Sequence, residues 1–137
     1  MYPNEIVVPC REELTNKGFN SLETPEAVSE AIENTKGLHL VVVNSVCGCA
    51  ARGARPGVIN SLQNDKKPTS LSTVFAGVDA PAVEKAREYF LPYPPSSPSI
   101  ALFKDGKLVH FVERFQIESA TDEMLTNHLK AVYDELG

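Results

Sequence analysis

The chain has 137 residues and a net charge of −5 at pH 7, with 18 acidic residues against 13 basic ones. A mildly acidic chain without a basic tract is unlike nucleic-acid-binding proteins, whose affinity comes largely from neutralising phosphates. It has no apolar run near the roughly 20 residues that cross a bilayer, and its N-terminus lacks the basic and apolar segments of a secretion signal. We therefore expect a cytoplasmic protein that binds neither nucleic acid nor a membrane.

Hydrophobic periodicity and the positions of proline and glycine predict an alternation of helices and strands. The expected elements, in chain order, are a helix over 9–18, an extended segment over 19–22, a helix over 24–37, a strand over 38–43, a kinked helix over 50–62, a strand over 71–78, a helix over 79–90, a hairpin of strands over 100–103 and 108–112, and a helix over 118–136. Thr24 and Asp79 are expected to cap their helices, Pro56-Gly57 to cause the kink, and Asp105-Gly106 to form the hairpin turn.

The central strand and the order of the elements indicate the fold class. The run from Leu38 to Val43 is apolar and β-branched without polar alternation, which is typical of a strand covered on both faces. Residues 92–98 are rich in proline and serine and predict an irregular loop. The alternation predicts an α/β fold with a central mixed β-sheet flanked by α-helices. We expect one domain over residues 1–137, with residues 1–18 as an N-terminal helical extension.

Two of the three cysteines, Cys47 and Cys49, are separated only by Gly48. In a reducing cytosol, cysteines so close together indicate redox or metal chemistry more than a structural disulfide. A strand that leads into Cys47 and on into a helix places this sulfur at the helix N-terminus, where unpaired N–H groups and the helix dipole favour the thiolate. Cys47 is therefore the candidate nucleophile, and Cys49 lies within reach to attack a mixed disulfide formed on it. Gly48 supplies the backbone freedom that so tight a closure requires.

The one-residue spacer also bears on the type of redox reaction. A Cys-Gly-Cys disulfide closes a smaller ring than the two-residue spacer of ordinary oxidoreductases, and we expect that ring to be strained. Strained disulfides are more oxidising and are typical of labile or catalytic pairs. The spacing therefore favours an isomerase or a resolver of mixed disulfides over a general reductant.

The segment from Ser97 to Gly106 resembles the corresponding part of thioredoxin-fold proteins. In that family, a proline that follows a cis peptide bond opens an apolar strand ending in Phe-Lys-x-Gly and faces the active-site cysteines. Here the pattern falls on Pro98 and Phe103-Lys104, and only an X–Pro bond adopts the cis form at small cost. The resemblance implies a thioredoxin-like fold in which the Ser97 N–H and C=O groups pair with a bound thiol substrate.

Further segments narrow the resemblance to the bacilliredoxin family. They are residues 11–15, 41–51, 54–56, 96–99 and 101–106, and they include the run Val-Asn-Ser-Val-Cys-Gly-Cys-Ala. The resemblance implies a thiol–disulfide oxidoreductase that removes bacillithiol, or a similar low-molecular-weight thiol, from mixed disulfides on client proteins. It implies no cofactor beyond this thiol as co-substrate, with Cys47 taking the thiol from the client and Cys49 either resolving the product or modulating the reaction. One departure is Val41, where thioredoxins carry a buried aspartate that accepts a proton.

Two other functions fit the same cysteines. One is a general protein disulfide isomerase. The other is a thiolate metal-binding module, because thiolates one residue apart can bind Zn²⁺ or Cu(I). Tetrahedral zinc needs further ligands, and we expect no metal site because the remaining candidates are scattered without motif spacing. These candidates are Cys10, His39, His110 and His128.

Two arginines follow the cysteines by about one helical turn. Arg52 and Arg55 either bind the carboxylates of a small acidic thiol or belong to a solvated helix face. Several other side chains are expected to have only structural roles, as a small residue, as hydrogen-bonded histidines or as a packing residue. They are Cys10, His39, His110 and Tyr93.

Overall fold

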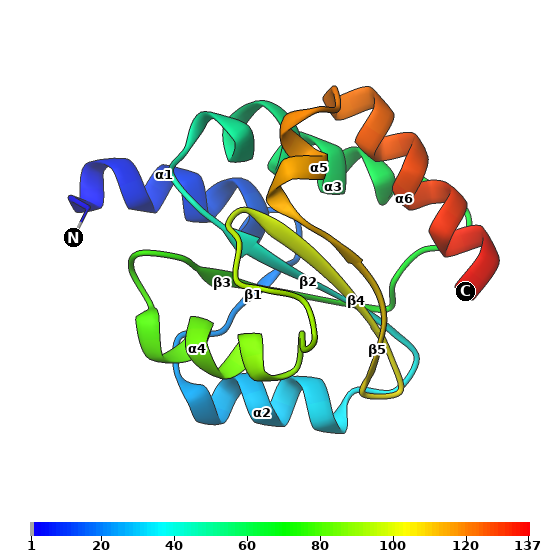
Figure 1. Ribbon diagram of the computed structural model, residues 1–137, viewed down its shortest axis with the longest axis horizontal. Helices are drawn as coiled ribbons and strands as arrows, with labels where there is room; N and C mark the ends of the chain where they lie inside the picture. The colour runs from blue at the N-terminus through cyan, green and yellow to red at the C-terminus, as the bar shows by residue number, and fades with distance from the viewer. Residues whose placement is uncertain (1) are drawn as a thin grey trace.

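The computed structural model describes residues 2–137 and shows one β-sheet with helices on both sides (Figure 1). The strands are β1 (Asn20–Ser21), β2 (Leu38–Asn44), β3 (Ser70–Phe75), β4 (Ser99–Lys104) and β5 (Lys107–Val112). The helices are α1 (Asn4–Thr15), α2 (Pro25–Asn34), the π-helical segment η1 (Ala50–Ala54), α3 (Arg55–Ser61), α4 (Ala80–Glu88), α5 (Arg114–Glu118) and α6 (Asp122–Leu136). Within the described residues, none of these helices is both long and apolar enough to cross a bilayer.

The sheet has five strands in the order β1-β3-β2-β4-β5. β1, β3 and β2 are parallel, whereas β4 is antiparallel to β2 and β5 is antiparallel to β4. A mixed sheet of this order between two helical layers confirms the expected fold class and is consistent with a thioredoxin-like fold.

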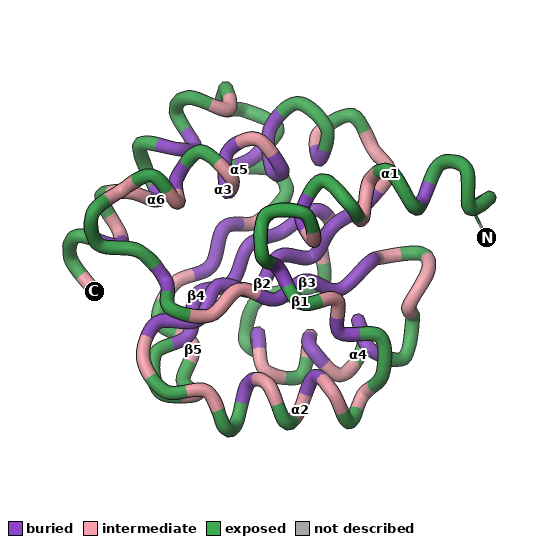
Figure 2. Tube along the Cα trace, turned by 180° about the vertical axis from the view of Figure 1, so that it is seen from behind, coloured by how far each residue is buried: buried purple, intermediate pink, exposed green. Residues whose placement is uncertain are grey.

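The central strand β2 explains the unbroken apolar run in the sequence, because all seven of its residues are buried. Leu40 and Val42 belong to one hydrophobic core, which α1, α3, α5 and α6 cover. Val41 and Val43 belong to a second core, which α2 and α4 cover on the opposite face. Figure 2 shows the strands buried between these two layers. Alternate side chains of β2 therefore enter different cores, and both must be apolar.

Several local signals in the sequence are confirmed. The Thr24 hydroxyl accepts a hydrogen bond of 3.1 Å from the backbone N–H of Ala27, so it caps α2 as expected. The turn between β4 and β5 places Asp105 at φ 51° and Gly106 at φ 82°. Both angles lie in the left-handed region, which is typical of the Asp-Gly turn that was expected there.

The first helix begins earlier than expected. α1 starts at Asn4 rather than near Pro9, and Pro9 lies inside it. A proline inside a helix cannot donate to the carbonyl four residues earlier, here that of Glu5. Because Glu5 and Pro9 are both exposed, water can satisfy that carbonyl, and the helix continues through the proline.

The expected last helix is two helices. α5 ends at Glu118, and α6 begins after Thr121, whose hydroxyl accepts a hydrogen bond of 3.1 Å from the N–H of Met124. Thr121 is therefore an N-cap inside a stretch that helical spacing alone treats as continuous. The start of α5 lies beside the segment that leads into β4, where the N–H of Arg114 donates a hydrogen bond of 3.3 Å to the Ser96 hydroxyl.

Three further boundaries differ from expectation. β3 ends at Phe75, before Gly77, which adopts φ 83° in the following turn. Asp79 precedes α4 but makes no capping bond, because its carboxylate accepts a hydrogen bond of 3.0 Å from Arg11 instead. The helix that was expected to kink at Pro56-Gly57 contains the π-helical segment η1 just before the proline. A widened turn there relieves the contact between the proline ring and the carbonyl four residues earlier.

Candidate active site

The candidate site lies where β2 ends and the next helical segment begins. Asn44 and Ser45 are buried at the end of the strand, and helical structure starts at Gly48. The carbonyl of Cys47 accepts hydrogen bonds from the N–H groups of Ala50 (3.1 Å) and Ala51 (3.2 Å). Cys47 therefore occupies the first turn of a helix at the carboxyl end of the central strand, as the sequence predicted.

The Cys47 thiol has an environment that favours its ionised form. Ser45 donates a hydrogen bond of 3.1 Å from its hydroxyl to Cys47 Sγ, and the same oxygen accepts one of 3.3 Å from the Cys47 N–H. Partial burial by itself would raise the pKa of Cys47. Hydrogen bonds from Ser45 and from the N–H groups of Ala50 and Cys49, together with the charge of Arg114, outweigh burial and lower this pKa below its usual value.

Ser45 was not singled out in the sequence, although a signal for it exists. Serine shortly before a helix is typical of a capping residue. Here the hydroxyl serves both the Cys47 backbone and its sulfur. A serine two residues before a candidate nucleophile at a strand-to-helix junction is therefore a recognisable pattern.

Replacing Ser45 by alanine is expected to slow alkylation of Cys47 at neutral pH by about three- to tenfold, because the thiolate loses a hydrogen bond. The rate of carbamidomethylation by iodoacetamide should be measured against pH in a chain that also carries Cys10→Ala and Cys49→Ala. The midpoint of the profile should move to higher pH. Ser45→Thr keeps the hydroxyl and serves as the control; equal profiles for all three chains would contradict the assignment.

The predicted Ser97-Pro98 segment approaches Cys47 from the start of β4. The Ser97–Pro98 peptide bond is cis, as the sequence implied, and a second cis bond precedes Pro92. Ser97 is half-buried and lines a pocket of about 230 Å³ together with Cys47, whereas Pro98 is buried behind it. The structure therefore brings Ser97 and Cys47 to one pocket.

Arg114 is part of the same pocket and was missed in the sequence. Its Nη1 donates a hydrogen bond of 3.2 Å to the Ser97 carbonyl, and its Nε donates to the carboxylate of Glu118. Arg114 is exposed at the start of α5. No local pattern marks it, because it reaches the Cys47 pocket only where the start of α5 lies against Ser96 and Ser97.

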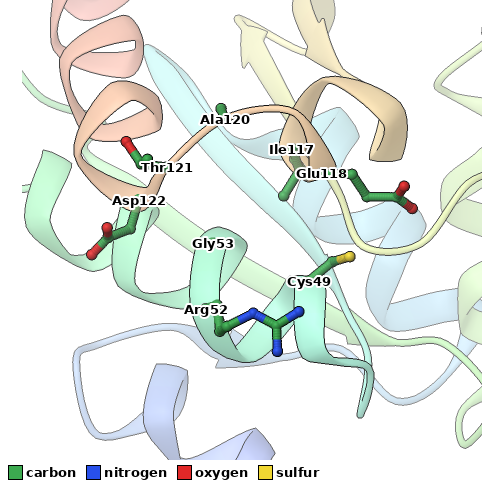
Figure 3. A pocket seen from close by; sticks show the side chains of 8 residues that line it. All are labelled: Cys49, Arg52, Gly53, Ile117, Glu118, Ala120, Thr121 and Asp122. Atoms are coloured by element: carbon green, nitrogen blue, oxygen red, sulfur yellow. The ribbon is translucent and has the colours of Figure 1, made fainter.

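Cys49 lines a second pocket (Figure 3), which Cys47 does not line. This pocket has a volume of about 300 Å³ and is lined by Cys49, Arg52, Gly53, Ile117, Glu118, Ala120, Thr121 and Asp122. The guanidinium of Arg52 lies against Gly48: a methyl group placed on that glycine would come within 2.8 Å of Arg52 Nη1. Gly48 therefore makes room for a cation between the two cysteines.

Arg55 has a different role from either of those expected for it. It is 2% exposed, so it neither lies on a solvated face nor is free to bind a ligand. Its Nη1 donates to Asn44 Oδ1 at 3.0 Å and to the Ser45 carbonyl at 2.8 Å, and its Nε lies 3.0 Å from a carboxylate oxygen of Glu13. Arg55 thus ties α1 and α3 to the segment that carries the Ser45 hydroxyl.

His39 has the surroundings expected of a hydrogen-bonded structural histidine, and Cys10 is a half-buried residue of α1. Asn44 donates a hydrogen bond of 3.0 Å to the backbone carbonyl of Cys10, whose thiol is free. His39 is buried, with its Nε2 2.7 Å from the Ser72 hydroxyl. Burial lowers the pKa of His39 to about 4, so its ring is neutral.

The remaining candidates lie away from the cysteine pair. His110 and His128 meet at 2.9 Å between their Nε2 atoms. Tyr93 stacks on Phe111 with ring centroids 4.8 Å apart, which agrees with a packing role. Within residues 2–137, no three histidine, cysteine, aspartate or glutamate side chains are grouped so that they could hold a metal ion.

Comparison with known proteins agrees with this geometry. A family model described as disulphide isomerase matches residues 2–137. A bacilliredoxin of Cytophaga hutchinsonii is 62% identical over 136 residues, which cover 99% of this chain and 100% of that protein. A bacilliredoxin of Halalkalibacterium halodurans is 52% identical over 134 residues, covering 98% of this chain and 93% of its relative. A third, from Bacillus cereus, is 55% identical over 128 residues, or 92% and 89% of the two chains.

The resemblance first noted in the Cys-Gly-Cys segment thus extends over almost the whole chain. Sequence identities above 50% to three bacilliredoxins, together with the dithiol at the end of β2, show the family. The chain belongs to the bacilliredoxin family of thiol–disulfide oxidoreductases.

Proposed function

We propose that this protein removes bacillithiol, or a similar low-molecular-weight thiol, from mixed disulfides on client proteins. The Cys47 thiolate attacks the sulfur of the small thiol, the client sulfur leaves as a thiolate, and the small thiol remains on Cys47 as a mixed disulfide. Cys49 then attacks the Cys47 sulfur, so that the small thiol leaves and a Cys47–Cys49 disulfide forms. Each step exchanges one S–S bond for another, and the client cysteine ends up reduced.

The observation that carries this proposal is the state of the Cys47 thiol. A hydroxyl and two backbone N–H groups stabilise its thiolate, in a pocket that it shares with Ser97. Cys47 is only partly buried, so a disulfide carried by another protein can reach its sulfur. These are the properties of a nucleophilic cysteine rather than a structural one.

We assign Ser97, Pro98 and Gly48 to the binding of the substrate. The Ser97 N–H makes no hydrogen bond to the part of the chain that the structure describes, and it is available to the backbone of a client. The Ser97 carbonyl already accepts a hydrogen bond from Arg114, so a client that pairs with this carbonyl must share it with the guanidinium. Pro98 is buried next to Ser97 and fixes the backbone there, and Gly48 leaves room for the Arg52 guanidinium beside the two cysteines.

The proposal is tested with Cys47→Ser and Cys49→Ser in a Cys10→Ala background. Each chain is mixed with a single-cysteine protein that carries bacillithiol on its cysteine, and the products are followed by intact mass. Cys49→Ser should accumulate the mixed disulfide of Cys47 with bacillithiol, because no second thiol resolves it. Cys47→Ser should accumulate none, and equal trapping by the two variants would overturn the roles assigned.

A second candidate function is general disulfide isomerisation, which the description of the matching family model favours. The two functions differ in what leaves the client, a small thiol or another cysteine of the same client. Reactivation of scrambled ribonuclease A measures the second function directly. Reactivation as fast as the removal of bacillithiol would make isomerisation the better description.

The reaction also bears on the compartment. A dithiol that acts in its reduced form requires a pool of reduced small thiol, which is typical of the cytosol. We therefore propose that the protein acts there.

A further inference from the structure

The pocket beside Cys49 contains a cation that has no partner. Arg52 is exposed, and it forms no ion pair with any of residues 2–137. Its side chain extends along the floor of the pocket toward Cys49 (Figure 3), and its guanidinium lies against Gly48. One pocket thus combines an available sulfur with an available positive charge.

The acidic residues of the pocket do not neutralise this charge. Glu118 is engaged by Arg114, which reaches it from the side of Cys47. Asp122 stands at the opposite edge, with its carboxylate turned away from Arg52 (Figure 3). The volume of about 300 Å³ is at the lower end of the range for small-molecule sites. The pocket therefore fits a small anionic ligand rather than a polypeptide segment.

We propose that this pocket is the docking site for the small thiol that reduces the Cys47–Cys49 disulfide, and that Arg52 selects thiols that carry a carboxylate. This inference rests on the proposed function, because it concerns the disulfide that ends the client reaction. It adds a second site beside Cys49. This site is separate from the Cys47 pocket, where the small thiol is removed from the client.

The reaction at this site is a thiol–disulfide exchange in two steps. The docked thiolate attacks Cys49 Sγ, the Cys47–Cys49 bond breaks, and Cys47 leaves as a thiolate. A second molecule of the small thiol attacks the sulfur of the bound one, releases Cys49 as a thiolate and leaves as the small-molecule disulfide. Two small thiols are oxidised and one protein disulfide is reduced, so electrons and atoms balance.

The difference between the two cysteine sulfurs decides which of them the small thiol attacks. In disulfide exchange the sulfur that forms the more stable thiolate is the better leaving group. Cys47 is that sulfur here, because Ser45 donates to it at 3.1 Å. Attack is therefore favoured at Cys49, and Cys49 is the cysteine that faces the Arg52 pocket.

The test compares two thiols on the preformed Cys47–Cys49 disulfide in a Cys10→Ala background. 3-Mercaptopropionate carries a carboxylate, whereas 2-mercaptoethanol does not. The rate of reduction by 3-mercaptopropionate is divided by the rate of reduction by 2-mercaptoethanol, so that effects of a mutation common to both thiols cancel in this ratio. Arg52→Gln should lower this ratio by about three- to tenfold. Lys107→Gln removes one exposed positive charge at the turn between β4 and β5, at the opposite end of the sheet, and should leave the ratio unchanged.

The same samples locate the attack. After acid quenching and alkylation, peptide fragmentation should find 3-mercaptopropionate on Cys49. An unchanged ratio in Arg52→Gln, an equal fall in Lys107→Gln, or the adduct on Cys47 would each overturn the docking site. Transfer of bacillithiol from a client to Cys47, measured in Cys49→Ser, does not involve this pocket. If that transfer succeeds while the ratio is unchanged, only the docking site is wrong; if it fails, the proposed function is wrong.

Discussion

Replacing Arg55 by methionine is expected to lower the free energy of unfolding by about 3 kcal/mol. The guanidinium is almost fully buried and donates to Asn44 Oδ1 and to the Ser45 carbonyl. Methionine fills a similar volume but donates nothing, so two buried acceptors lose a charge-assisted hydrogen bond. The ion pair with Glu13 adds less, because that carboxylate is half-exposed. Urea denaturation followed by circular dichroism measures the change.

The same substitution at a neighbouring position provides the control. Arg52→Met removes an exposed guanidinium from the same helical segment and should change the unfolding free energy by less than about 0.5 kcal/mol. Arg55→Lys keeps the positive charge but lacks the planar guanidinium with its several N–H donors. Its loss of unfolding free energy should lie between those of Arg55→Met and Arg52→Met. If Arg55→Met and Arg52→Met were equally stable, the buried network would not hold the site together.

Acidification is expected to destabilise the fold through His39. Burial lowers the pKa of this histidine to about 4, whereas in the unfolded chain it is near its ordinary value of 6.5. Below pH 6.5 the unfolded chain therefore binds a proton that the folded chain does not, and stability falls as the pH falls. The loss is complete near pH 4 and amounts to about 3 kcal/mol.

Urea denaturation at a series of pH values between 7 and 4 tests this expectation against His39→Gln. The variant lacks the titrating group, so its unfolding free energy should change less over this range than that of the wild type. His110, whose pKa is also lowered by burial and by His128, is present in both chains, and its contribution cancels in the comparison. Parallel pH profiles for the two chains would show that His39 is not the group responsible.

The local parts of the site were predictable because they depend on residues adjacent in the chain. A β-branched run, a Cys-Gly-Cys and a helical segment follow one another directly, and each has a short-range signature. The break before α6 was missed although Thr121 is a recognisable cap, because the apolar spacing on both sides agrees with one helix. Pro9 was misleading for the opposite reason: a residue typical of helix starts is tolerated inside α1, where water reaches the freed carbonyl.

The two arginines show the limit of sequence patterns most clearly. Arg52 and Arg55 lie in one helical segment and look equivalent in the sequence, yet one is exposed beside Cys49 and the other is buried under Ser45. Which one is buried depends on the packing of α1 and α3 around the end of β2. That packing involves residues far apart in the chain, and periodicity carries no information about it.

The family, the cysteine pair and its place at a strand-to-helix junction could all be recognised in the sequence, because each depends on residues that are neighbours in the chain. The surroundings of the pair depend instead on how distant segments pack: Arg114 comes from α5 to the Cys47 pocket, and Glu13 of α1 pairs with Arg55, which holds Ser45. This packing also places the two sulfurs in different pockets. Residues so far apart in the chain come together only because their segments fold around the carboxyl end of β2.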